Sequence, residues 1–254
     1  MGGQRRPVLL VHHGRSRRER ILHYLTFLLT AAAALAAAAD WVLADRPPSG
    51  LRTVTKTSAM FLLLAAGASV VLAPEEMFPH RLPLPAAALV LSGMALSLVG
   101  DVLLLREHLF TAGLGVFLIA HLAYTAAFAL MAFESARLLG PTSVAAGAVA
   151  GAAVVASAVF VLGRTILAGA ERRGERAPVA AYLAAISAMV VAAGASGHPW
   201  AAVGAGLFYA SDTLLAWRRY VGQGAGSTFR WREWHVMATY HVAQFCFLAV
   251  LAFG

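Results

Sequence analysis

Long apolar runs separated by short clusters of charged residues constrain the fold of this chain more than any other feature. A helix needs about 20 residues to cross the hydrocarbon core of a bilayer. Eight runs reach or approach that length, over residues 21–43, 55–73, 85–105, 110–133, 142–168, 178–194, 199–217 and 233–253. Because lipid offers no hydrogen-bonding partner to an open backbone, such runs have to be helical. We therefore predict an all-α fold, a polytopic membrane helix bundle of about eight transmembrane helices. Seven is the alternative count, because the run at 178–194 is the shortest.

The amino-acid composition excludes a soluble globular domain. Hydrophobic residues make up 60% of the 254 positions and charged residues only 13%, whereas soluble domains carry about 25% charged residues. The mean hydropathy is +0.72. A net charge of +8 would suit nucleic acid, but the Arg clusters flank the apolar runs, where such residues set membrane topology. We therefore expect an integral membrane protein with no nucleic-acid partner.

The chain divides into a basic polar tail over residues 1–20 and a transmembrane helical domain over residues 21–254. Turn residues, such as Gly140-Pro141 and Gly197-His198-Pro199, separate successive runs. Eight helices place both termini on one side of the membrane. Basic residues in the loops of the opposite side favour a cytoplasmic position for that side, whereas the Arg-rich tail favours the reverse. The orientation therefore stays open.

Few ionisable residues lie inside the predicted helices, and they are the first functional candidates. An Asp, Lys or Arg costs about 2.5–3.5 kcal/mol at the centre of a membrane helix. Asp101, His121 and Asp212 lie within runs, Lys56 begins one, and Asp40 lies near the end of the first, where we read it as interfacial. The helical rise places Asp101 and Asp212 about 6–8 Å from one membrane face and His121 about 16 Å from it. These depths predict a polar pocket in that half of the membrane.

Further polar residues share helix faces with these groups. Residues three or four apart on a helix are neighbours, which joins Tyr240 to Gln244, Tyr124 to His121, and Tyr209 to Asp212. We predict Asp101 and Asp212 as the catalytic residues. The predicted substrate-binding residues are Lys56, His121, Tyr124, Tyr209, Tyr240 and Gln244.

Two buried carboxylates that share a site do not both ionise easily, which leaves a proton donor beside an acceptor. Such a pair can perform general acid/base hydrolysis. Two functional alternatives stay open, beside a structural membrane protein with incidental polar contacts, which the gathering of polar residues on one side disfavours. One is a metal site with His121, Asp101 and Asp212 as ligands, which the lack of a second well-placed His weakens. The other is a small transporter or channel in which the same three residues form a proton or solute path.

Short blocks of sequence carry a family resemblance. Lys56 with Leu62 and Leu63 forms the first block, and the remaining blocks follow in order: Gly100-Asp101-Val102-Leu103-Leu104, Phe117-Leu118-Ile119-Ala120-His121-Leu122-Ala123-Tyr124, Gly204-Ala205-Gly206-Leu207-Phe208-Tyr209-Ala210-Ser211-Asp212, and Tyr240-His241-Val242-Ala243-Gln244. In order and spacing these blocks resemble the successive motifs of the YhhN family of integral membrane lysoplasmalogenases.

The resemblance implies a hydrolase of lysophospholipids. Enzymes of this kind cleave the vinyl-ether bond of choline or ethanolamine lysoplasmalogens to a fatty aldehyde and a glycerophospho-headgroup. We assign Asp212 as the acid and Asp101 as the base, with the reversed roles as the alternative, and place Lys56 with Arg218 or Arg219 at the lipid phosphate. We expect no cofactor and no metal. The expected partners are a lysophospholipid substrate and membrane lipids. The Arg-rich and Ala-rich composition indicates a bacterial inner membrane, and since many bacteria lack plasmalogens, a related lysolipid or ether lipid remains an alternative substrate.

Overall fold

The computed structural model describes residues 17–46, 49–222 and 232–254, and within these ranges every regular element is helical. The elements are α1 (Arg17–Leu43), α2 (Gly50–Leu72), α3 (Leu84–Leu104), the 3₁₀ turn η1 (Glu107–Leu109), α4 (Phe110–Leu139), α5 (Pro141–Ala158), the π-helical turn η2 (Val159–Gly163), α6 (Arg164–Glu171), α7 (Arg176–Ala195), α8 (Pro199–Tyr220) and α9 (Glu233–Phe253). The prediction of an all-α polytopic membrane bundle is confirmed. Most of the predicted basic tail, residues 1–16, lies outside the described residues.

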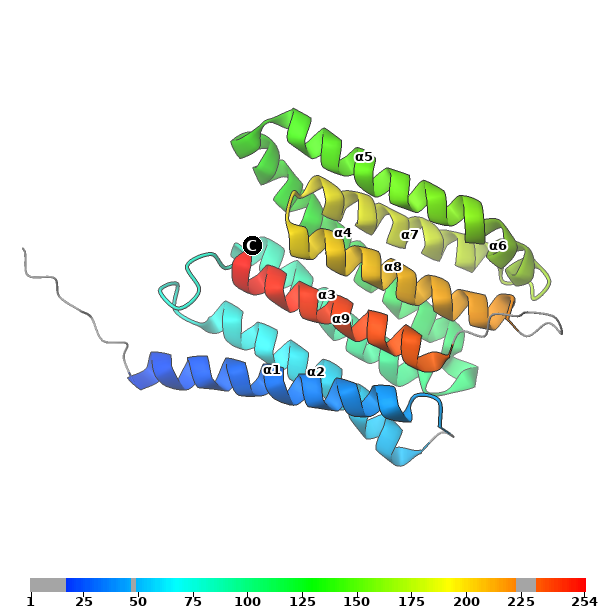
Figure 1. Cartoon of the computed structure of the whole chain (residues 1–254), viewed down its shortest axis with the longest axis horizontal. Helices are drawn as coiled ribbons and strands as arrows, with labels where there is room; N and C mark the ends of the chain where they lie inside the picture. Colours follow the sequence, from blue (N-terminus) through cyan, green and yellow to red (C-terminus); the bar gives the residue numbers. More distant parts are fainter. Residues whose placement is uncertain (1–16, 47–48, 223–231) are drawn as a thin grey trace, which may run out of the picture.

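Eight crossings make up the described bundle, because α5, η2 and α6 follow one another as a single segment over residues 141–171 (Figure 1). Seven of the crossings are long and apolar enough to span a membrane by length and composition. The crossing that does not qualify is α8. The run at 178–194, which the sequence marked as the shortest, is part of α7, and α7 is 20 residues long and does qualify. Asp212 with its neighbours Ser211 and Thr213 makes the middle of α8 polar, and Arg218 and Arg219 lie in its last turn.

Glycine and proline form two of the turns where the sequence predicts them. Gly140 and Gly197 have φ angles of 87° and 71°, a left-handed region that other residues enter only at a cost. Pro141 and Pro199 then begin α5 and α8, at a position where the missing N–H is not needed by the helix. Both turns reverse the chain at the same end of the bundle (Figure 1).

Helix α9 lies at the centre of the bundle, and α1 and α5 lie at its edges (Figure 1). Buried residues make up 67% of the apolar window of α9, against 6% for the segment containing α5 and α6. The outward faces carry large exposed apolar side chains, among them Phe27, Phe133 and Phe160. A bilayer solvates such faces, so their exposure is expected of a membrane protein.

Small residues bring α5 and α7 into close contact. A Cβ added to Gly147 would lie 2.1 Å from the carbonyl oxygen of Gly194, and one added to Gly194 would lie 2.5 Å from that of Gly147. The two backbones therefore touch directly, as small residues allow in membrane helix packing. This contact holds the lipid-exposed α5 against the rest of the bundle.

We predict that Gly194→Ala lowers the thermal unfolding midpoint of the detergent-solubilised protein. The added methyl group has no space, and overpacking of this kind costs about 1–3 kcal/mol. Gly206→Ala is the matched control, because a Cβ at Gly206 meets nothing within 4 Å and Ala favours a helix over Gly by about 1 kcal/mol. The thermal unfolding midpoint of each variant is measured by tryptophan fluorescence. Equal midpoints for Gly194→Ala and Gly206→Ala would contradict the close α5–α7 contact.

Candidate functional site

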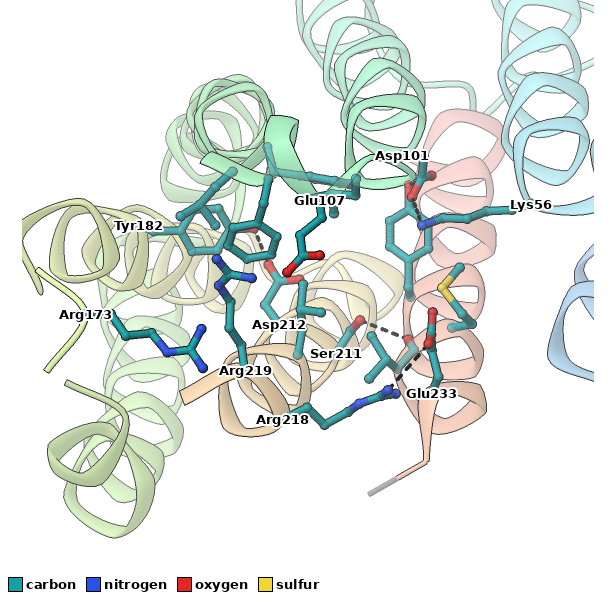
Figure 2. A pocket seen from close by; sticks show the side chains of 18 residues that line it. Lys56, Asp101, Glu107, Arg173, Tyr182, Ser211, Asp212, Arg218, Arg219 and Glu233 are labelled. Atoms are coloured by element: carbon teal, nitrogen blue, oxygen red, sulfur yellow. Dashed lines mark hydrogen bonds and ion pairs between the residues drawn. The ribbon is translucent and has the colours of Figure 1, made fainter. Parts of the chain in front are cut away.

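A polar cavity of about 390 Å³ lies at the end of the bundle where α2, α4, α7 and α9 begin and α3 and α8 end (Figure 2). Charged side chains of both signs line it, together with two tyrosines, one serine and an apolar wall. The charged residues are Lys56, Asp101, Glu107, Arg173, Asp212, Arg218, Arg219 and Glu233. The cavity lies on the membrane side toward which the predicted polar residues gather.

Asp101 forms one wall of the cavity and is almost fully buried, with 2% of its surface exposed. Its carboxylate receives two donors from two different helices. The Lys56 ammonium on α2 lies 3.1 Å from Oδ1, and the Tyr240 hydroxyl on α9 donates to Oδ2 at 2.6 Å. A cation and a neutral hydroxyl on the same carboxylate both favour its ionised form.

The glycine before Asp101 has a packing role. A Cβ at Gly100 would lie 2.6 Å from the ring of Phe117 on α4, so only glycine leaves room for that ring. Phe117 lines the cavity beside Asp101 and packs edge-to-face against Tyr240, with ring centres 6.0 Å apart. Gly100 therefore lets α4 approach α3 closely enough to support the Tyr240 hydroxyl.

Asp212 on α8 forms another part of the wall, and its donors differ from those of Asp101. The Tyr182 hydroxyl on α7 donates to Oδ2 at 2.6 Å, and Nε2 of the fully buried His121 lies 3.5 Å from the same oxygen. No Lys or Arg pairs with this carboxylate among the described residues. The side chain of Asp212 is 13% exposed against 3% for that of Asp101, so Asp212 is the more accessible from the cavity.

The outer rim of the cavity carries ion pairs. Arg218 lies 3.4 Å from Glu233, which also pairs with Arg52 of α2. Glu107 of η1 projects into the cavity (Figure 2) and has no ion-pair partner within the described ranges. The rim therefore presents both a cationic and an anionic group toward the opening.

Arg219 is held at the rim by two direct contacts, and a neighbouring hydrogen bond supports one of them. Its guanidinium lies 3.5 Å from Glu175 and stacks over the ring of Phe110 at 3.6 Å from the ring centre. The Tyr220 hydroxyl donates to Glu175 at 2.6 Å. This hydrogen bond is the main reason that the pKa of Glu175 lies below its ordinary value, and the positive charge of Arg219 lowers it further. Glu175 therefore keeps a negative charge beside Arg219 and orients it.

An aromatic layer closes the inner end of the cavity. Tyr124, Phe128, Phe208 and Phe247 are each 0% exposed. The Phe208 ring lies 4.7 Å from the His121 ring, centre to centre, and 5.3 Å from that of Tyr240. These rings separate the cavity from the far half of the bundle.

The predicted site residues divide into three groups. Lys56, Asp101, Asp212 and Tyr240 line the cavity, and His121 contacts Asp212 from behind. Tyr124 and Gln244 lie deeper, where the Tyr124 hydroxyl donates to Gln244 Oε1 at 3.0 Å. Tyr209 does not line the cavity, because three residues of helix turn it about 60° away from Asp212.

Sequence reasoning missed Tyr182, which donates to Asp212, and the rim residues Glu107, Arg173 and Glu233. Tyr182 is the one aromatic residue in α7, which is the only signal that would have marked it. The rim residues lie at helix ends and in the segments between helices, where charged residues are common whether or not they surround a cavity.

Metal ligation by His121, Asp101 and Asp212 would require the three side chains to converge. Within residues 17–46, 49–222 and 232–254, no group of three or more His, Cys, Asp or Glu residues is placed to hold a metal ion. Asp101 and Asp212 instead form separate hydrogen bonds to Tyr240 and Tyr182. The described residues therefore do not assemble the ligand set of the metal alternative.

Comparison with known proteins identifies a family. No curated protein and no solved structure shows significant similarity to the chain. The YhhN family matches residues 51–251, which cover α2 to α9 apart from the first residue of α2 and the last two of α9, and include every residue of the cavity. The chain therefore belongs to the YhhN family.

Proposed function

We propose that this protein is an intramembrane hydrolase that cleaves the vinyl-ether bond of lysoplasmalogen-type lysophospholipids. The products are a fatty aldehyde and a glycerophospho-headgroup, and the reaction uses Asp-based general acid/base catalysis. The observation that carries the proposal is the pair of carboxylates, Asp101 and Asp212, that line one cavity with different donors. The composition further suggests a bacterial inner membrane as its location.

The donors suggest which carboxylate holds the proton. Asp101 receives a cation and a hydroxyl, which stabilise its negative charge. Asp212 receives one neutral hydroxyl, from Tyr182, and desolvation in a bundle disfavours a charge that no cation balances. A protonated Asp212 beside an ionised Asp101 gives the acid and the base that the reaction needs.

The reaction can then proceed in balanced steps. Asp212 transfers its proton to the vinyl carbon farther from the ether oxygen, which leaves an oxocarbenium ion stabilised by the Asp101 carboxylate. Asp101 accepts a proton as water adds to the cation and forms a hemiacetal. Collapse of the hemiacetal releases the aldehyde and the glycerol hydroxyl of the headgroup. One water is consumed, and proton exchange through the cavity returns Asp212 to its protonated form.

The rim is suited to a zwitterionic lipid headgroup. Arg173, Arg218 and Arg219 line the outer part of the cavity and can bind the phosphate. Glu107, which has no ion pair among the described residues, offers an anion to a choline or ethanolamine group. Lys56 is paired with Asp101, so its proposed role is to hold the base, and phosphate binding is assigned to the arginines.

Transport is the competing function, and the packing argues against it. A proton or solute path through Asp101, Asp212 and His121 has to continue to the other membrane face. The fully buried aromatic layer around Phe208 and Phe247 blocks that continuation. A cavity closed at its inner end is suited to a substrate that enters and leaves by the same side.

Purified protein in detergent, incubated with a lysoplasmalogen, is expected to release fatty aldehyde, measured with a coupled dehydrogenase. Asp101→Asn and Asp212→Asn should each lower kcat by about 10²–10⁴-fold, the usual contribution of a general acid or base. Glu134→Gln, at an exposed Glu paired with Arg137 outside the cavity, should retain wild-type activity. No aldehyde from the wild type would refute this substrate, and full activity of both cavity variants would refute the mechanism.

Tyr240→Phe is expected to reduce kcat by about 10-fold or more. A hydrogen bond to a charged group contributes about 1.5–3 kcal/mol, and each 1.36 kcal/mol changes a rate about tenfold. Tyr209→Phe removes the same hydroxyl from a tyrosine outside the cavity and should change kcat less than about twofold. The same reduction in both variants would mean that the Tyr240–Asp101 bond has no specific part in catalysis.

A further inference from the structure

Two small apolar cavities adjoin the polar cavity at Asp212. Each has a volume of about 40 Å³. The first lies between α4, α7 and α8, and it shares Phe110, Leu114 and Leu215 with the apolar wall of the polar cavity. The second lies between α6, α7 and α8. Asp212 and its donor Tyr182 line all three cavities, so this hydrogen-bonded pair lies where they meet.

The two apolar cavities also adjoin each other. Val179 of α7 and Ala216 of α8 line both of them but not the polar cavity. Apart from the hydrogen-bonded pair, their walls are apolar except at Thr213 and Tyr220. The Thr213 hydroxyl donates to a backbone carbonyl of its own helix at 2.8 Å, and that of Tyr220 donates to Glu175 at 2.6 Å. These walls therefore present hydrocarbon surface to a ligand, and the small volumes exclude a charged headgroup.

The second apolar cavity reaches the lipid-exposed edge of the bundle. Its wall includes Ile166 of α6, which belongs to the lipid-exposed segment over residues 141–171 (Figure 1), and the partly exposed Leu183 of α7. Ile186 on the same wall lies ten residues after the start of α7, about 15 Å into that helix. The apolar cavities therefore extend from Asp212 sideways and inward, toward the hydrocarbon core of the membrane.

The three cavities present, in order, the surroundings that suit the parts of a single-chain phospholipid. Arginines at the rim can bind a phosphate, Asp212 lies at the boundary, and hydrocarbon walls follow. In an alkenyl lysophospholipid the vinyl ether joins the glycerol to the hydrocarbon chain. A lipid with its headgroup at the rim and its chain in the apolar cavities therefore places its vinyl ether beside Asp212.

We infer that the two apolar cavities form a chain site, which binds the hydrocarbon chain of a single-chain phospholipid between α7 and α8. Because membrane lipid is as apolar as these walls, the chain gains little affinity by entering them. The contribution of the chain site is orientation of the bound lipid. Chain binding requires no reaction, whereas the orientation of a vinyl ether rests on the proposed function.

The chain site assigns the two carboxylates to different parts of the substrate. The vinyl carbon that takes the proton is on the chain side of the ether, and Asp212 lines the chain site. Asp101 lines the polar cavity but neither apolar cavity, and it lies toward Lys56 on the other side of the polar cavity (Figure 2). With the chain bound, Asp212 faces the carbon to be protonated and Asp101 faces the headgroup side.

Chain binding is tested without catalysis. The full-length protein in nanodiscs of diacyl phosphatidylcholine is equilibrated with a 1-O-alkyl lysophosphatidylcholine that carries a diazirine in its chain and has no vinyl ether to cleave. After illumination, the labelled residues are mapped by mass spectrometry. Residues within 179–186 and 213–216 should be labelled, and an excess of the same lipid without the diazirine should prevent this labelling. Labelling confined to outward side chains such as Phe27 and Phe133, or insensitive to the excess lipid, would overturn the chain site.

Ala216→Phe should close the chain site, because position 216 lines both apolar cavities. Overpacking shifts an equilibrium by about 10-fold or more, so the competed labelling should fall by about 10-fold. Ala202→Phe makes the same change at an exposed position of α8 that lines none of the three cavities, and it should label as the wild type does. Equal labelling of the two variants would overturn the inference. Leu183→Phe, on the partly exposed wall of the second cavity, takes the place of Ala216→Phe if that variant does not fold.

If the wild type releases aldehyde, chain length gives a catalytic readout. The ratio of kcat/KM for a sixteen-carbon over a four-carbon alkenyl lysophospholipid should fall about 10-fold in Ala216→Phe and stay unchanged in Ala202→Phe. Position 216 lies about one helix turn, or 6 Å, from Asp212, so the short chain ends before reaching it. Partitioning of each lipid into the membrane is common to all variants and cancels in this comparison. An unchanged ratio in Ala216→Phe would overturn the chain site.

The two experiments separate the chain site from the proposed function. Competed labelling without aldehyde release from either chain length would support the chain site and refute the vinyl-ether substrate. Aldehyde release without competed labelling would retain the proposed function and overturn the chain site.

Discussion

The pairing of Lys56 with Asp101 is the interaction on which the polar end of this protein depends. Neither charge is tolerated alone in a low-dielectric bundle, since removing one partner leaves the other uncompensated. The Lys56 ammonium on α2 and the Tyr240 hydroxyl on α9 both bind the Asp101 carboxylate, at 3.1 Å and 2.6 Å. Three helices, α2, α3 and α9, are therefore tied together at the point where the cavity begins.

The two carboxylates gain different properties from their surroundings. Asp101 is bound by a cation and enclosed, while Asp212 is held by the Tyr182 hydroxyl and is more open to the cavity. In the proposed mechanism these chemically identical side chains take opposite tasks, Asp101 as the base and Asp212 as the proton donor. This asymmetry is the feature that supports the proposed hydrolase over a symmetric binding cavity.

Glycines and aromatic rings together shape the cavity. Gly100 admits the Phe117 ring, and Gly204 admits the Phe247 ring, whose atoms would lie 2.7 Å from an added Cβ. Close helix packing through small residues is typical of membrane proteins. Here it draws large rings into the centre, where they fill the inner half of the bundle and leave the polar half hollow. The same packing explains why the cavity opens toward one membrane face.

The sequence by itself determined the membrane bundle, its approximate boundaries and the membrane face toward which the polar residues lie. Helical rise and the cost of charge in lipid are local properties, so the shared depth of Asp101 and Asp212 could be estimated before any helix was placed against another. Only the tertiary structure decided which groups meet. It paired Lys56 with Asp101, brought Tyr182 from α7 to Asp212, turned Tyr209 away from the cavity and buried Asp40. The physical reason is that these contacts depend on the rotation and neighbours of each helix, which the hydrophobic pattern of a lipid-exposed segment does not specify.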